Sequence, residues 1–124
     1  MGLTISSAPD YSRVYDIVKK TMITVFVDQL GADRFDPARD WETPMEKKLE
    51  GGSGLGLDLK NVREIILRLR KDPEYGSRFR ERLPDDEKFA SDLYKGDKAT
   101  PLRMQGIIVN RTMISELPQD SSSA

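Results

Sequence analysis

A single apolar stripe of helical period runs through residues 11–30, and it constrains the fold more strongly than any other feature of the chain. Its members recur every three or four positions: Tyr11, Val14, Tyr15, Val18, Met22, Phe26 and Leu30. This spacing predicts one amphipathic helix, with Ser7–Asp10 as the capping sequence before it and Gly31 as its end. The dense Thr, Ile, Val and Phe residues of 21–27 also suit a strand.

Shorter apolar stripes follow in the second half of the chain. The first places Leu59, Val62, Ile65, Ile66 and Leu69 on one helical face. Asp72-Pro73 then ends one helix and begins the next, because proline suits a first turn and restricts the residue before it. Later stripes contain Tyr75, Phe79 and Leu83, then Phe89 and Leu93, and finally Leu102, Val109, Met113 and Leu117 after Thr100-Pro101. Residues 106–110 also suit a short strand.

These patterns predict an all-α fold, a compact bundle of five or six short helices. The alternative is an α+β fold with short strands near 21–27 and 106–110. A helix over residues 11–30 would leave its apolar face exposed to water if it stood alone. We therefore expect it to pack against the helices after residue 58. Phe35 and Trp41, in the connection that follows Gly31, are expected to pack back on the same core.

The run Leu49-Glu50-Gly51-Gly52-Ser53-Gly54 is typical of an engineered Gly/Ser linker, since such runs form flexible coil. It divides the chain into a helical segment, 3–48, and a helical domain, 55–117, before a tail, 118–124, that we expect to be disordered. Either two partner segments were fused, or a loop was deleted from one domain. A natural glycine-rich loop is the third interpretation.

Composition excludes several classes of function. The 124 residues include no histidine and no cysteine, which removes the commonest general base and the commonest zinc ligands. The glycines of 51–56 match neither phosphate-binding loop, and the acidic run at 85–87 suits the first turn of a helix. We therefore expect no enzyme activity, no catalytic residue, no metal and no cofactor. Without an apolar run of membrane-spanning length, we expect no membrane partner and a cytoplasmic or other intracellular location.

Basic residues are concentrated between positions 60 and 82, where eight arginines and lysines face four acidic residues. The predicted partner-binding residues are Arg68, Arg70, Lys71, Arg78, Arg80 and Arg82. The predicted interface or core residues of the first segment are Tyr11, Val14, Tyr15, Val18, Met22 and Phe26. Over the whole chain the net charge is −1, so no general electrostatic preference for nucleic acid exists.

The sequence predicts a protein–protein interaction or assembly module in an engineered single-chain form. Its partner would be another protein or a peptide, held in an apolar groove rimmed by arginines. The alternative is a nucleic-acid-binding domain that uses the basic segment 60–82. An enzyme that uses carboxylates alone ranks third.

Overall fold

The structure, a computed structural model, describes residues 11–44, 59–83, 87–95 and 99–114. These residues form six α-helices and one short 3-10 helix, with no strand among them. In chain order the elements are α1 (Tyr11–Leu30), α2 (Pro37–Asp40), α4 (Leu59–Lys71), α5 (Pro73–Phe79), η2 (Arg80–Arg82), α6 (Glu87–Lys95) and α7 (Pro101–Ile114). The prediction of an all-α bundle is confirmed, and both predicted strand alternatives are wrong.

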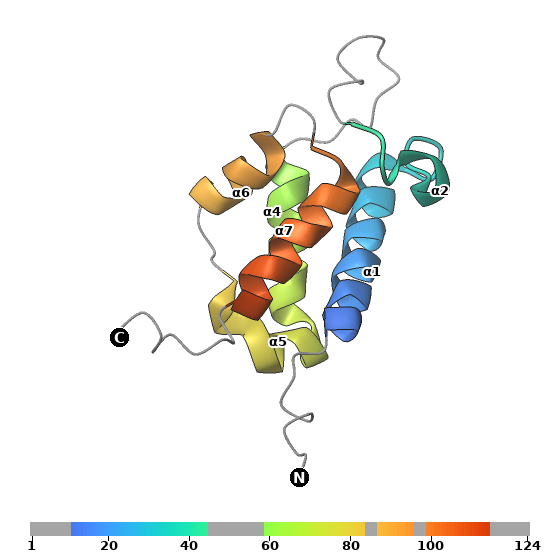
Figure 1. Cartoon of the computed structure of the whole chain (residues 1–124). Coiled ribbons are helices and arrows are strands. Elements are labelled where there is room, and N and C mark those ends of the chain that lie inside the picture. The colour runs from blue at the N-terminus through green and yellow to red at the C-terminus, as the bar shows by residue number, and fades with distance from the viewer. Residues whose placement is uncertain (1–10, 45–58, 84–86, 96–98, 115–124) are drawn as a thin grey trace.

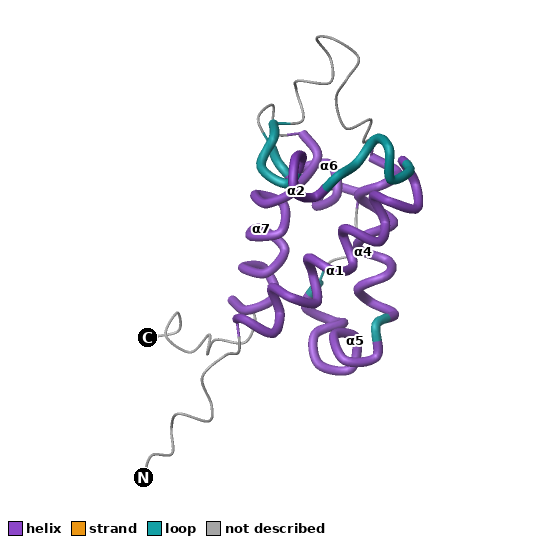
Figure 2. Tube along the Cα trace, turned by 90° about the vertical axis from the view of Figure 1, so that its right-hand side faces the viewer, coloured by secondary structure: helices purple, strands orange, loops and turns teal. Residues whose placement is uncertain are grey.

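Three long helices, α1, α4 and α7, form the body of the bundle (Figure 1). α1 packs against both α4 and α7, and α6 packs against α4 and α7. The short helices lie at opposite ends of this body: α5 closes one end, and α2 and α6 lie at the other (Figure 2). α5 and η2 therefore present their outer surface at one end of the molecule, away from the start of α7.

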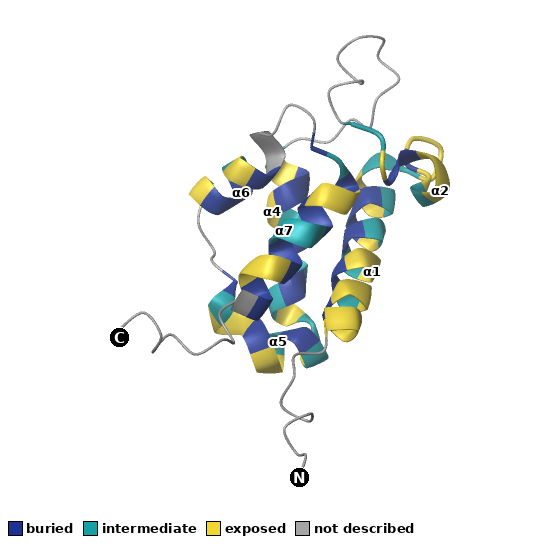
Figure 3. Ribbon diagram, viewed as in Figure 1, coloured by how far each residue is buried: buried dark blue, intermediate teal, exposed yellow. Residues whose placement is uncertain are grey.

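The buried face of α1 follows the predicted apolar stripe (Figure 3). Its buried residues are Val14, Val18, Met22, Val25 and Phe26. Full burial of a side chain of this kind stabilises the fold by about 1.5–3 kcal/mol. This gain outweighs the weak helix preference of β-branched residues, a few tenths of a kcal/mol each, so residues 21–27 continue the helix.

Tyr11 and Tyr15 correct the prediction for this stripe, because their side chains do not enter the core. They remain 39% and 37% exposed. Tyr11 begins the helix. The Tyr15 hydroxyl lies 3.9 Å from the position that a Cβ would take on Gly106 of α7. Tyr15 therefore lies at the rim of the contact between α1 and α7, partly exposed to water.

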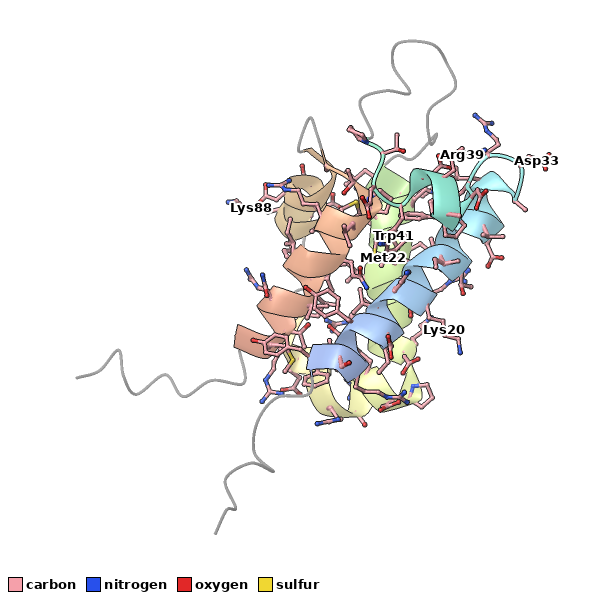
Figure 4. All side chains as sticks on the ribbon, turned by 45° about the vertical axis from the view of Figure 1, so that its right-hand side comes forward. Lys20, Met22, Asp33, Arg39, Trp41 and Lys88 are labelled. Atoms are coloured by element: carbon pink, nitrogen blue, oxygen red, sulfur yellow. The ribbon has the colours of Figure 1, made fainter. Side chains whose placement is uncertain are left out.

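The segment after α1 folds back on the bundle, as predicted. Gly31 ends the helix with a φ of +94°, a conformation that glycine adopts without steric cost. Phe35 and Trp41 are both buried and lie edge to face, with Phe35 also against Phe26. Figure 4 shows Trp41 on the inner side of the bundle near Met22, whereas Lys20, Asp33 and Lys88 point outward.

Side-chain caps begin two of the later helices where the sequence predicts them. The Asp72 carboxylate accepts hydrogen bonds from the backbone N–H groups of Glu74 and Tyr75, each 2.9 Å long. Thr100 Oγ1 accepts from the N–H of Arg103 at 3.0 Å. Leu102 is 42% exposed, which corrects its place in the last apolar stripe, because the second residue of a helix can face outward while Met104 and Ile108 fill the core.

Several predictions fall outside the described residues. They are the cap at Ser7–Asp10, the Gly/Ser linker at 49–54, the acidic residues Asp85 and Asp86, and the tail at 118–124. Glu87, the last of the predicted acidic run, does lie in the first turn of α6.

Candidate functional site: an arginine hollow at the end of the bundle

An open hollow of about 530 Å³ lies on the outer surface of α5 and η2. We call it the arginine hollow. It is lined by Gly76, Ser77, Arg78, Arg80, Glu81 and Arg82. Three of these residues are among the six predicted to bind a partner. The lining contains no large apolar side chain, so the arginines surround a polar surface rather than the predicted apolar groove.

Local contacts hold two of these arginine side chains in place. The guanidinium carbon of Arg78 lies 5.2 Å from the centre of the Phe79 ring, a distance at which a cation is attracted to the ring face. Arg82 donates a hydrogen bond of 2.8 Å to the carbonyl oxygen of Arg78. Arg80 is exposed between them. The hollow is thus partly ordered before any partner arrives.

Arg70, also a predicted partner-binding residue, has a different position. Its Nη1 donates to the carbonyl oxygens of Leu83 at 2.6 Å and Arg80 at 3.3 Å. These bonds tie the turn that follows η2 to the last turn of α4. Arg70 therefore holds the backbone beside the arginine hollow and does not line the hollow itself.

Arg68 lies away from the arginine hollow, at the contact between α4 and α1. Its guanidinium group donates to Glu64 at 2.8 Å and to Asp28 of α1 at 3.0 Å. The bonds to Glu64 and then Asp28 raise the pKa of Arg68 above its ordinary value, so it stays charged. Lys71, the last residue of α4, is exposed and does not line the hollow. The six predicted residues therefore do not form one surface.

A second hollow, of about 370 Å³, lies between α1 and the junction of α4 with α5. Its lining mixes both charges with two hydroxyls: Arg13, Asp16, Ile17, Lys20, Thr21, Thr24, Arg68, Asp72 and Glu74. Arg13 and Glu74 form an ion pair across it, and the hydrogen bond from Arg13 lowers the pKa of Glu74. Its three cations, Arg13, Lys20 and Arg68, are equal in number to its three anions, Asp16, Asp72 and Glu74, so the lining has no net formal charge to favour a charged ligand.

The predicted core residues Val14, Val18, Met22 and Phe26 are fully enclosed within the chain. They pack against the chain's own helices and offer no surface to a separate partner. Within the ranges that the structure describes, exposed large hydrophobic side chains lie on three different helices: Tyr11 and Tyr15 on α1, Leu67 on α4 and Leu102 on α7. Singly exposed apolar residues are normal on soluble domains and do not mark a groove.

Buried polar groups in the core hold the fold together. The Tyr75 hydroxyl is hydrogen-bonded to Thr112 Oγ1, which also lies 2.9 Å from the carbonyl oxygen of Ile108. Burial raises the pKa of Tyr75 above its ordinary value.

Among the described residues, no three Asp, Glu, His or Cys side chains gather as metal ligands. No helix in the described part of the chain has the length and hydropathy to cross a membrane.

Sequence reasoning missed Ser77, Glu81 and Gly76 as parts of the site. All three lie in the same stretch as the arginines, residues 76–82, and the turn from α5 into η2 places them around one hollow. Comparison of the chain with models of protein families, with curated proteins and with solved structures finds no match.

Proposed function

We propose that this chain is a protein–protein interaction module that binds an acidic segment of its partner in the arginine hollow. One observation carries the proposal: Arg78, Arg80 and Arg82 line a single hollow on the outside of the bundle. Guanidinium groups match carboxylates in shape and charge and form paired hydrogen bonds with them. The hollow lies on the surface of α5 and η2, with the core behind it.

The nucleic-acid alternative uses the same basic segment, residues 60–82. The three guanidinium groups could also donate hydrogen bonds to the phosphates of a nucleic-acid backbone. Two other arginines of the segment already have carboxylate partners: Arg63 pairs with Glu87, and Arg68 pairs with Glu64 and Asp28. A strand of nucleic acid needs a continuous track of cations, so these pairs favour the protein-binding proposal.

An affinity measurement with charge-reversal variants tests the proposal. A short glutamate-rich peptide is titrated into the protein by calorimetry, and Arg80→Glu is expected to weaken binding at least about tenfold, or about 1.4 kcal/mol. The matched control is Arg103→Glu, which makes the same change of charge on the exposed face of α7 at the other end of the bundle. That control should leave the affinity unchanged.

Two results would count against the proposal. Equal weakening by Arg80→Glu and Arg103→Glu would mean that only the net charge matters. A single-stranded oligonucleotide that binds more tightly than the peptide, with an affinity that falls steeply as salt rises, would favour the nucleic-acid alternative.

We further propose that residues 49–54 are an engineered linker that makes one chain of two segments able to recognise each other. The packing of α1 on α4 and α7 supports this, because α1 precedes the linker and both of its neighbours follow it. Separation of the segments would remove α4 and α7 from the buried face of α1, which carries five buried side chains.

Cleavage of the linker tests that proposal. A protease site is placed within residues 49–54 and cut after folding. The two pieces are expected to elute together from a size-exclusion column. They should unfold at a lower urea concentration than the uncut chain, because two separate pieces gain more conformational entropy on unfolding than two pieces held together by a linker. Pieces that separate at once in buffer would contradict the proposal.

A further inference from the structure

We infer that the group recognised in the arginine hollow is a phosphate monoester carried on a side chain of the partner protein. This inference rests on the proposed function and makes it more specific. It follows from the compactness of the hollow, from its charge and from the way its donors are held.

The residues that line the hollow lie close together in the sequence. All of its lining residues lie between Gly76 and Arg82, within the end of α5 and η2. An extended acidic peptide advances about 3.3 Å per residue with successive side chains on opposite sides, so its carboxylates do not gather at one point. A phosphate group offers three acceptor oxygens from one atom, so a single group can meet several guanidinium groups at once.

The charge of the lining also fits a phosphate. Three arginines and Glu81 give it a net charge of +2. A phosphate monoester carries about −1.5 to −2 at neutral pH, whereas one carboxylate carries a single negative charge. Phosphate therefore matches the formal charge of the lining side chains more closely than one carboxylate does.

The donors around the hollow are held at several points. Arg78 lies over the Phe79 ring, Arg82 is bonded to the carbonyl of Arg78, and Arg70 fixes the backbone of Arg80 from behind. Donors that are ordered in advance lose less conformational entropy when a ligand binds.

Ser77 adds a neutral donor to the same hollow. Its side chain is exposed, and its hydroxyl makes one long hydrogen bond of 3.3 Å to the carbonyl of Glu74. A phosphate oxygen is a better acceptor for this hydroxyl than the carbonyl oxygen of Glu74, because hydrogen bonds to ionised groups are shorter and stronger.

Three peptides that differ only in their central residue test the inference. The residue is phosphoserine, glutamate or serine, flanked by alanine and glycine, and binding is followed by NMR on the full chain through the backbone amides of Ser77 and Arg80. The phosphoserine peptide is expected to bind at least about tenfold more tightly than the glutamate peptide. The serine peptide should not bind measurably.

Variants assign that preference to the hollow. Arg80→Gln should remove most of the preference for phosphoserine over glutamate, and Arg80→Lys should reduce it, because lysine keeps the charge but loses the fork of donors. Arg103→Gln, at the far end of the bundle, is the matched control and should change nothing. Circular dichroism on each variant establishes that it is folded.

Each alternative outcome has a distinct meaning. Equal binding of the phosphoserine and glutamate peptides would overturn this inference and leave the proposed function standing. Binding of neither peptide would overturn this inference, and the proposed function would fall with it only if the glutamate-rich peptide also failed to bind. A single-stranded oligonucleotide that displaces the phosphoserine peptide and binds more tightly would also overturn the inference, in favour of nucleic-acid backbone phosphate.

Discussion

Arg70 is the residue that joins the arginine hollow to the body of the bundle. Its side chain donates to the carbonyl oxygens of Arg80 and Leu83 and thereby holds η2 against the end of α4. Leu83 itself is fully buried. Loss of this arginine would leave a carbonyl group near the core without its charged donor, which is more costly than loss of an exposed contact.

We expect Arg70→Gln to lower the free energy of unfolding by about 1–3 kcal/mol, the range for leaving a buried hydrogen-bonding group unsatisfied. Urea denaturation followed by circular dichroism measures the change. Lys71→Gln removes the same charge from the next, exposed position and should stay within about 0.5 kcal/mol of the parent protein. Equal effects of the two substitutions would mean that Arg70 has no anchoring role.

At the scale of single residues, the sequence did not predict which arginines lie together in the fold. Arg68 and Arg80 look alike in sequence, yet Arg68 pairs with Asp28, which lies forty positions earlier in the chain. Tyr11 and Tyr15 fit the spacing of a buried stripe, but they lie at its exposed rim. Spacing along one helix does not reveal which part of that helix its neighbours cover.

The contact between α5 and the end of α4 depends on a glycine. A Cβ on Gly76 would lie 2.5 Å from the carbonyl oxygen of Arg70, and the nearest atoms belong to the backbone, which cannot move aside as a flexible side chain can. Gly106, within α7, has open space around it apart from the Tyr15 hydroxyl at 3.9 Å.

These two glycines predict opposite effects of the same substitution. Gly76→Ala should destabilise the protein by about 1–3 kcal/mol through overpacking. Gly106→Ala should stabilise it by about 0.5–1 kcal/mol, because alanine loses less conformational freedom than glycine in a helix. Thermal unfolding of both variants measures the difference, and a stabilising Gly76→Ala would mean that α5 does not pack closely on α4.

At the scale of helices, most of the structure could be predicted from the sequence. The end of α1 at Gly31 and the starts of α5 after Asp72 and of α7 after Thr100 follow from local capping residues. Each of these signals lies within a few residues of the helix terminus that it sets. The strand alternatives at 21–27 and 106–110 were wrong because burial against other helices decided between two local preferences. Burial depends on the whole fold, so no local pattern could settle it.

For the whole molecule, the sequence shows an excess of positive charge in residues 60–82. It does not show which of these side chains pair with carboxylates and which line the arginine hollow. The fold gives Arg63 and Arg68 carboxylate partners on α6, α4 and α1, and it leaves Arg78, Arg80 and Arg82 around one hollow. Exposed ion pairs of this kind contribute only about 0.2–1 kcal/mol each. Their larger effect is to occupy the guanidinium groups of Arg63 and Arg68 with carboxylates of the same chain.

The most direct test of this account is a map of NMR shift changes in the full chain during titration with the glutamate-rich peptide. The account predicts saturable changes that cluster in the backbone amides of residues 76–82 and that weaken as salt is added, since the contacts are between exposed charges. Saturable changes centred on α1 or α7, with residues 76–82 unmoved, would contradict it, as would no saturable change at all.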